Sequence, residues 1–291
     1  MLFAMGAQRA SLHRNSARFG SLIAALVLGA LFVAPVSAAS SAVDPAPVVS
    51  SGDPAAATGP KVVIVVGPAH GATGKYISSA RRLASQARSY GARVTELYSP
   101  NATWARVKAA AKGANLLIYL GHGNGTPSPY TNRPESTNGM GLNSSASGSH
   151  GNTKYYGAPY VDQIQLAPNA VVILNRLCYA SGNNEWGAGN PTLAVATRRV
   201  DMYGWSFFRA GAKAVFAEGI TDPSYVLKGL FKTDKTIEQI FWSSPNATDR
   251  YTREFNSTRT TGMSAVLDPY APSRYYRSVI GKLTLKASDW R

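Results

Sequence analysis

The sequence predicts an α/β protein built on a doubly wound, mostly parallel sheet in a Rossmann-like, three-layer arrangement. First, short apolar runs alternate with segments of helical spacing between residues 61 and 120, a rhythm typical of βαβ units. Second, the apolar runs are continuous and rich in Val, Ile and Leu. Unbroken runs of this kind are expected of strands that are covered on both faces of a parallel sheet.

The first three strands and two helices are expected in strict alternation. Gly91 ends the first helix, and Asn101 is expected to cap the second. The expected ranges are 61–66, 93–98 and 115–120 for the strands and 75–90 and 101–112 for the helices. The Gly- and Asn-rich stretch 121–168 then interrupts the alternation. A loop of this length in a compact domain is usually functional or disordered, and its tyrosines favour an ordered surface with a short hairpin.

The second half resumes the alternation and ends in a polar tail. Strands are expected at 170–174 and 213–217, and helices at 192–210, 224–231 and 236–242. The tail from about residue 243 is rich in Thr, Ser, Arg and Tyr, with one strand-like segment at 282–285. Residues 61–291 are therefore interpreted as a single domain with a Tyr-rich C-terminal extension.

The N-terminus is typical of a secretory signal. Residues 1–38 contain three arginines, then the apolar run 22–33, then the small residues of 36–38, which a signal peptidase requires. The run is short for a membrane span, so an uncleaved anchor is the alternative and no stable span is expected after cleavage. Residues 39–60, rich in Ala, Ser and Pro, are expected to form a disordered linker. A secreted or cell-surface location follows.

The formal net charge is +15, carried by basic residues scattered along the chain rather than clustered. An exported protein seldom meets nucleic acid, so no nucleic-acid partner is expected. The charge instead suits solubility and loose attraction to an anionic cell-envelope polymer. A phosphate-binding loop after the first strand is also excluded, because Ala69 and Tyr76 replace the Gly and the Ser or Thr that such a loop requires around Lys75.

The chemically capable residues follow two expected strands. His122 comes directly after the third strand, between Gly121 and Gly123, and Cys178 comes shortly after the fourth. Ligands bind at the carboxyl ends of strands in open α/β sheets. Cys178 is the only cysteine, so it forms no internal disulfide and is either buried and inert or free for a reason. An imidazole beside a thiol can take its proton, and N–H groups of the Gly121–Gly123 turn or of Cys178 can hold an oxyanion.

A strand ending in His-Gly, followed by a second apolar strand ending at a Cys, resembles the caspase–gingipain–clostripain group of cysteine peptidases. The resemblance covers residues 61 to about 217 and implies a sheet order 2-1-3-4 with a catalytic dyad of His122 and Cys178. The sequence departs from the group at Leu177, where members often carry a small residue, and it lacks a Gln-Ala-Cys-Xaa-Gly motif.

Other residues are weighed around this dyad. His70 follows the first strand and ranks behind His122 as a base. Glu185 and Asp162, and after them Glu218, are candidates for an acidic specificity pocket that selects Arg or Lys. His122, His150 and Cys178 lack the paired spacing of a zinc site, so no metal and no other cofactor is expected.

Two functions from different classes remain open. The first is a secreted or surface cysteine peptidase that hydrolyses amide bonds of a polypeptide through Cys178 and His122. The alternative is a non-catalytic module of the same fold that binds cell-envelope polymer or protein. One fold hosts many functions, so the arrangement of the site has to decide between them.

Overall fold

The computed structural model describes residues 58–146 and 149–291, which all belong to one compact unit. The expected signal peptide and most of the expected linker lie outside the described residues. Within the described ranges, no helix is both long and apolar enough to cross a membrane.

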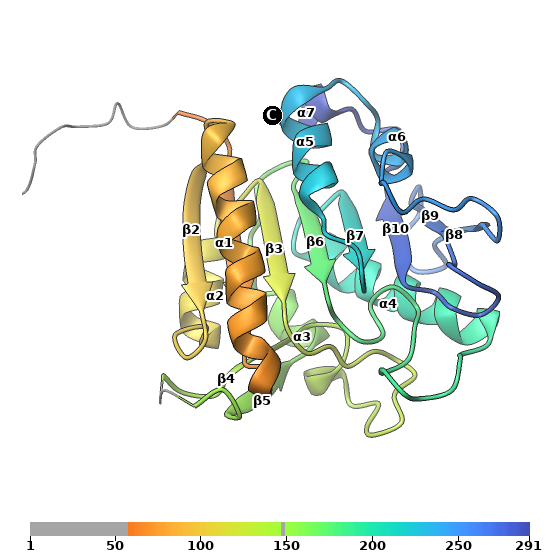
Figure 1. The fold of residues 1–291 in the computed structure, drawn as a ribbon, viewed down its shortest axis with the longest axis horizontal. Helices are drawn as coiled ribbons and strands as arrows, with labels where there is room; N and C mark the ends of the chain where they lie inside the picture. Colours follow the sequence, from red (N-terminus) through yellow and green to blue (C-terminus); the bar gives the residue numbers. More distant parts are fainter. Residues whose placement is uncertain (1–57, 147–148) are drawn as a thin grey trace, which may run out of the picture. The chain divides into compact units, whose positions relative to one another are not determined.

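A sheet of eight strands in the order β2-β1-β3-β6-β7-β10-β9-β8 forms the centre of this unit (Figure 1). The strands from β2 to β7 in this order pair in parallel, whereas β10, β9 and β8 pair antiparallel. The strands are β1 (Lys61–Val66), β2 (Arg93–Tyr98), β3 (Leu116–Leu120), β6 (Val171–Asn175), β7 (Ala214–Glu218), β8 (Arg253–Asn256), β9 (Ser264–Leu267) and β10 (Arg277–Gly281). The predicted α/β class with a large, mostly parallel sheet is therefore confirmed.

Helices cover both faces of the sheet, which gives three layers. The helices are α1 (Thr73–Ser89), α2 (Trp104–Ala111), α3 (Ala158–Val161), α4 (Leu193–Arg209), α5 (Ser224–Lys232), α6 (Ile237–Trp242) and α7 (Ala287–Trp290). Alternate residues of β1 enter opposite cores, because successive side chains of a strand point to opposite faces. Val62 and Ile64 pack with α1, α5, α6 and α7, whereas Val63 and Val65 pack with α2, α3 and α4.

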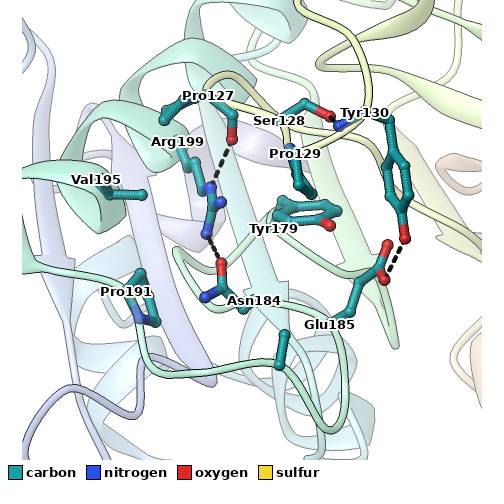
Figure 2. Close-up of a pocket in the computed structure, with 11 residues that line it drawn as sticks. Pro127, Ser128, Pro129, Tyr130, Tyr179, Asn184, Glu185, Pro191, Val195 and Arg199 are labelled. Carbon is teal, nitrogen blue, oxygen red and sulfur yellow. Dashed lines mark hydrogen bonds between the residues drawn. The ribbon is translucent and has the colours of Figure 1, made fainter.

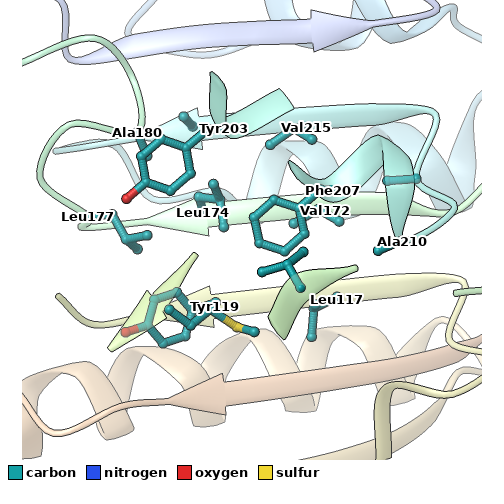
Figure 3. Close-up of a cluster of buried hydrophobic side chains, with 14 of the residues drawn as sticks. Leu117, Tyr119, Val172, Leu174, Leu177, Ala180, Tyr203, Phe207, Ala210 and Val215 are labelled. Atoms are coloured by element: carbon teal, nitrogen blue, oxygen red, sulfur yellow. The ribbon is translucent and has the colours of Figure 1, made fainter. Parts of the chain in front are cut away.

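Helix α4 anchors the second core over β3 and β6 (Figure 3). Tyr203 and Phe207 from α4 are fully buried beside Leu174 and Tyr119. Leu177, just beyond β6, joins the same cluster and is only 2% exposed. The Leu177 side chain therefore anchors the start of the loop after β6 in the core. This anchor orients the next residue, Cys178.

The expected hairpin lies in the long loop between β3 and β6. It consists of β4 (Met140–Asn143) and β5 (Thr153–Tyr156), which pair antiparallel. The short helix α3 follows it. The second helix begins later than expected, since its N-cap is Thr103 rather than Asn101.

The C-terminal tail completes the sheet rather than extending from it. The strand predicted at 282–285 is wrong, because the strand is β10 and it ends at Gly281. β10 begins with the buried polar residues Arg277 and Ser278, so its sequence did not look apolar. Arg277 lies within an ion-pair cluster with Glu218 and Asp268, and this pairing permits a charged residue inside the sheet.

Candidate functional site

Three loops that carry His or Cys leave the same edge of the sheet. β3 pairs in parallel with β1 on one side and with β6 on the other, with Leu120 opposite both Val66 and Asn175. Parallel neighbours lie about 4.8 Å apart and end at a common edge. The order along this edge is therefore His70, His122 and Cys178, and the predicted adjacency of the third and fourth strands is confirmed.

The His122 turn and the Cys178 loop are in direct backbone contact. A Cβ atom on Gly123 would lie 2.3 Å from the carbonyl oxygen of Cys178, and one on Gly125 would lie 2.6 Å from the Cβ of Tyr179. Both distances are shorter than any real contact of a side chain. The glycines around His122 therefore allow the two loops to pack together.

Hydrogen bonds of the Tyr119 hydroxyl hold the start of the His122 turn in place. Its buried hydroxyl lies 2.7 Å from the carbonyl oxygen of Gly141 and 2.9 Å from that of His122, and it accepts a hydrogen bond from the Gly141 N–H at 2.9 Å. The hairpin strand β4 is thereby joined to the turn. The backbone that presents His122 is tied to both the sheet and the hairpin.

His122 is half-buried and has an unpartnered nitrogen. Its Nε2 atom is shielded from solvent and has no hydrogen-bond partner. The ring of His70 contacts it edge-on, with the centroids 5.6 Å apart. Burial lowers the pKa of His122, and the nearby His70 lowers it further. A neutral imidazole with a free nitrogen can accept a proton.

Cys178 is also half-buried, and its loop is conformationally strained. Arg176 and Tyr179 on either side of it have positive φ angles of 66° and 71°, which bulky side chains rarely adopt. Such conformations cluster at functional sites. Burial raises the pKa of the Cys178 thiol, the charge of Glu185 raises it further, and a backbone hydrogen bond from Trp186 acts in the opposite direction.

Both shifts favour a neutral thiol and a neutral imidazole over an ion pair. A thiol of this kind reacts slowly until a base takes its proton. The backbone N–H groups of Gly123 and Cys178 donate to no other group in the described part of the chain. A backbone N–H group without a partner can donate to an oxyanion.

Residues of the loop that carries Cys178 line two hollows. The first has a volume of about 340 Å³ and is lined by Cys178, Arg176, Lys75, Tyr76 and Trp186, among others; we call it the thiol pocket. The second, of about 540 Å³, is drawn in Figure 2; we call it the proline pocket. Its lining residues are Pro127, Ser128, Pro129, Tyr130, Tyr179, Asn184, Glu185, Ala188, Pro191, Val195 and Arg199.

Arg199 closes the floor of the proline pocket (Figure 2). Its Nε donates to the Pro127 carbonyl at 3.1 Å, and its Nη1 donates to the Asn183 carbonyl at 2.8 Å. The guanidinium also lies 4.5 Å from the centre of the Tyr179 ring. One side chain of α4 therefore holds together the loops that follow β3 and β6.

The structure separates the three acidic candidates for a specificity pocket. Glu185 lines the proline pocket and accepts a hydrogen bond from the Tyr130 hydroxyl at 2.6 Å. Asp162 pairs with Arg209 at the C-terminal end of α4, which is the opposite edge of the sheet from Cys178. Glu218 is fully buried and paired with Arg277. Only Glu185 lies near the dyad.

His150, the third residue of the zinc alternative, lies in the loop that joins β4 to β5. The His150 ring contacts the Ser99 hydroxyl at 3.0 Å, and its carbonyl accepts from the His70 N–H at 3.2 Å. No group of three or more His, Cys, Asp or Glu side chains in the described ranges is arranged to hold a metal ion.

The sequence analysis ranked His70 behind His122 as a base but missed its contact with His122, and it did not single out Arg176 or Arg199 at this edge. His70 touches His122 because β1 adjoins β3 on the side away from β6, a contact that spacing does not reveal. Arg199 had a usable signal, since it lies on the face of its helix that also carries the buried Ala196 and Tyr203. A charged residue on an apolar helix face usually has a specific partner.

Comparisons with known proteins add no functional evidence to the geometry of the site. No family model and no curated protein matches the chain. One solved structure with some similarity is that of protein GSU0716 from Geobacter sulfurreducens, at 13% identity and a TM-score of 0.29, covering 63% of this chain and 87% of that one. A similarity of this size carries no functional argument.

Proposed function

We propose that this protein is an exported cysteine peptidase-like hydrolase with a caspase-like core, in which Cys178 is the nucleophile and His122 the acid and base. The observation that carries the proposal is the buried, unpartnered Nε2 of His122 on a turn packed against the backbone of Cys178. A buried polar atom without a partner is costly in a merely structural role. The export part rests on residues 1–38, whose composition is typical of a signal peptide.

The proposed reaction follows from these groups. His122 Nε2 takes the thiol proton as Cys178 Sγ attacks the amide carbon, and the oxyanion is held by the N–H groups of Gly123 and Cys178. The imidazolium then gives this proton to the leaving amine as the C–N bond breaks, which leaves a thioester. Water attacks the thioester, His122 takes its proton, and the carboxylic acid and free thiol are released.

The test is the pH dependence of Cys178 alkylation by iodoacetamide, read by mass on the full chain. A thiol assisted by a neutral imidazole gives a plateau of reactivity between the lowered pKa of His122 and the raised pKa of Cys178. We expect His122→Ala to remove this plateau and leave only the reaction of the free thiolate at high pH. His150→Ala is the matched control, because its ring contacts Ser99 instead.

If the parent chain and His122→Ala share one profile, the dyad is wrong. The non-catalytic module that binds cell-envelope polymer or protein then becomes the better account. A plateau that His122→Ala removes and His150→Ala retains supports the hydrolase, and a screen of peptide substrates follows.

A further inference from the structure

The proline pocket plays no part in the proposed hydrolysis, although it is the larger of the two hollows. Its volume is about 540 Å³, against about 340 Å³ for the thiol pocket, and neither Cys178 nor His122 lines it. Its apolar wall includes Pro127, Pro129 and Pro191. Proline has no backbone N–H group to offer a ligand, so polar recognition depends on the side chains at the floor and the rim.

Arg199 brings a positive charge to the floor of this pocket. The residue is only 4% exposed, and its Nη2 atom has no hydrogen-bond partner among the described residues. Its Nε and Nη1 atoms donate to uncharged oxygen atoms, and no ion pair in the described ranges includes it. A buried cation without a counter-charge is unfavourable, so an anionic group of a ligand is expected to bind here.

Glu185 brings the opposite charge to the rim. Its carboxylate accepts a hydrogen bond from the Tyr130 hydroxyl at 2.6 Å. It also lies beside the Tyr179 hydroxyl, and it is the second cause, after burial, that raises the pKa of Tyr179. Both partners are uncharged hydroxyls, and no cation among the described residues pairs with Glu185. A cationic group of a ligand is therefore expected at the rim.

The ring of Tyr179 separates these two charges. Figure 2 shows Arg199 and Glu185 on opposite sides of this ring. The guanidinium lies 4.5 Å from the centre of the ring, whereas Glu185 lies beside the hydroxyl. The charged groups of a single amino acid are too close together to reach both. An extended peptide of two or three residues spans about 7–10 Å, which suits two charges separated by an aromatic ring.

We propose that the proline pocket binds a short peptide with both termini free, its C-terminal carboxylate at Arg199 and its N-terminal ammonium at Glu185. The free Nη2 of Arg199 donates a charge-assisted hydrogen bond to the carboxylate, and the peptide lies along Tyr179. The sequence suggested that Glu185 and Asp162 select a basic side chain. Glu185 is assigned to a terminal ammonium instead, and Asp162 pairs with Arg209 at the far edge of the sheet.

The experiment is a calorimetric titration of the full chain carrying Cys178→Ala, so that no peptide is hydrolysed by the thiol. Trialanine is the probe, and N-acetyl-trialanine and trialanine amide each lack one of its terminal charges. We expect each blocked peptide to bind at least about tenfold more weakly than trialanine, because it leaves one charged group of the pocket without a partner. Free alanine has both charges but too short a span, so it should bind more weakly as well.

Variants in the same background assign each terminus to its residue. Arg199→Gln should remove the preference for a free carboxylate and keep the preference for a free ammonium, and Glu185→Gln should do the reverse. Arg198→Gln and Glu254→Gln are the matched controls, because Arg198 is the exposed neighbour on α4 and Glu254 is exposed on β8. If Arg199→Gln fails to fold, because Arg199 joins two loops, Glu185→Gln still tests the site.

Three results would overturn the proposal. The first is no binding of trialanine at millimolar concentration, and the second is binding that the blocked termini and the variants leave unchanged. The third is equally tight binding of free alanine, which would make the ligand a single amino acid. The titration uses a chain without a thiol, so its result is independent of the alkylation profile of His122→Ala, which tests the hydrolase.

Discussion

At the residue scale, Glu185 acts on both members of the proposed dyad. Its carboxylate is the second cause, after burial, that raises the pKa of Cys178. It also raises the pKa of His122, against the lowering by burial and His70. One acid therefore moves both limbs of the reactivity profile in the same direction, towards higher pH.

Replacing this acid should shift the whole profile. In Glu185→Gln the thiol loses a negative neighbour, so its pKa falls and the rise of alkylation above the plateau begins at lower pH. The pKa of His122 falls as well, so the acid limb moves to lower pH. Rates of iodoacetamide alkylation, read by mass, check both limbs. A range of about pH 5 to 10 covers the ordinary pKa values of His and Cys.

Glu135→Gln is the matched control for this charge change. Glu135 is exposed and affects the pKa of neither Cys178 nor His122. A profile of Glu185→Gln that superposes on that of Glu135→Gln would show that Glu185 does not act on the dyad.

At the scale of elements, the site depends on how closely two loops approach. The turn after β3 and the loop after β6 pack backbone against backbone, and Gly123 lies at the contact. Arg199 of α4 and Tyr119 of β3 secure the two sides of this contact. The helices and strands therefore hold the two loops in contact, and the loops carry the proposed dyad.

A methyl group at Gly123 should disrupt this contact. In Gly123→Ala the new Cβ would lie 2.3 Å from the Cys178 carbonyl oxygen, so the backbone must shift. We expect the free energy of unfolding to fall by about 1–3 kcal/mol and the His122-dependent plateau of alkylation to be lost. Urea unfolding followed by circular dichroism, with the alkylation profile, measures both effects.

Gly74→Ala is the contrasting substitution. Gly74 lies in α1, and a Cβ there would meet no atom within 4 Å. Alanine should stabilise the helix by up to about 1 kcal/mol. Equal stability of the parent and Gly123→Ala, with an unchanged profile, would show that the loops are not in tight contact.

At the scale of the whole molecule, a buried ion cluster joins the tail to the parallel sheet. Arg277 of β10 lies 3.2 Å from the Glu218 carboxylate at the end of β7 and also pairs with Asp268. Its Nη2 donates to the Phe241 carbonyl at 2.9 Å. The residues after Glu218, Gly219 and Ile220, line the thiol pocket, so the tail supports one wall of the site.

Removal of this arginine should destabilise the fold strongly. Arg277→Leu leaves two buried carboxylates without their cation, a loss expected to cost about 3–5 kcal/mol. Arg82→Ala removes the exposed pair with Asp222, whose closest atoms are 3.7 Å apart, and should cost less than about 1 kcal/mol. Urea unfolding of both variants at neutral pH checks the difference.

The sign of the pH dependence adds a second check. Burial raises the pKa of Glu218, and the charge of Arg277 lowers it, so the pKa rises further in Arg277→Leu. A carboxyl group with a raised pKa contributes stability that is present at low pH and is lost as pH rises through the folded-state pKa. The deficit of Arg277→Leu relative to the parent should therefore shrink as pH falls. A deficit that grows in acid would contradict the assignment.

The alternation of strands and helices was predictable because it depends on local patterns. The ranges of β1 and β2 agree with prediction at both ends, and β3, β6 and β7 differ by a single position. Burial on both faces demands continuous apolar strands. β10 was not predicted because its charged residue, Arg277, is neutralised by a partner far away in the sequence. No local sequence pattern indicates such a pairing.

The sequence by itself determined the α/β class, the parallel core and the positions of His122 and Cys178 after their strands. Only the tertiary structure decided which neighbours these residues have. It brought His70 to His122, placed Glu185 and Arg176 in the linings of two different pockets, and placed Asp162 at the far edge. The physical reason is that strand and helix formation follows from short-range periodicity, whereas the charge around a thiol is set by loops whose closure depends on long-range packing.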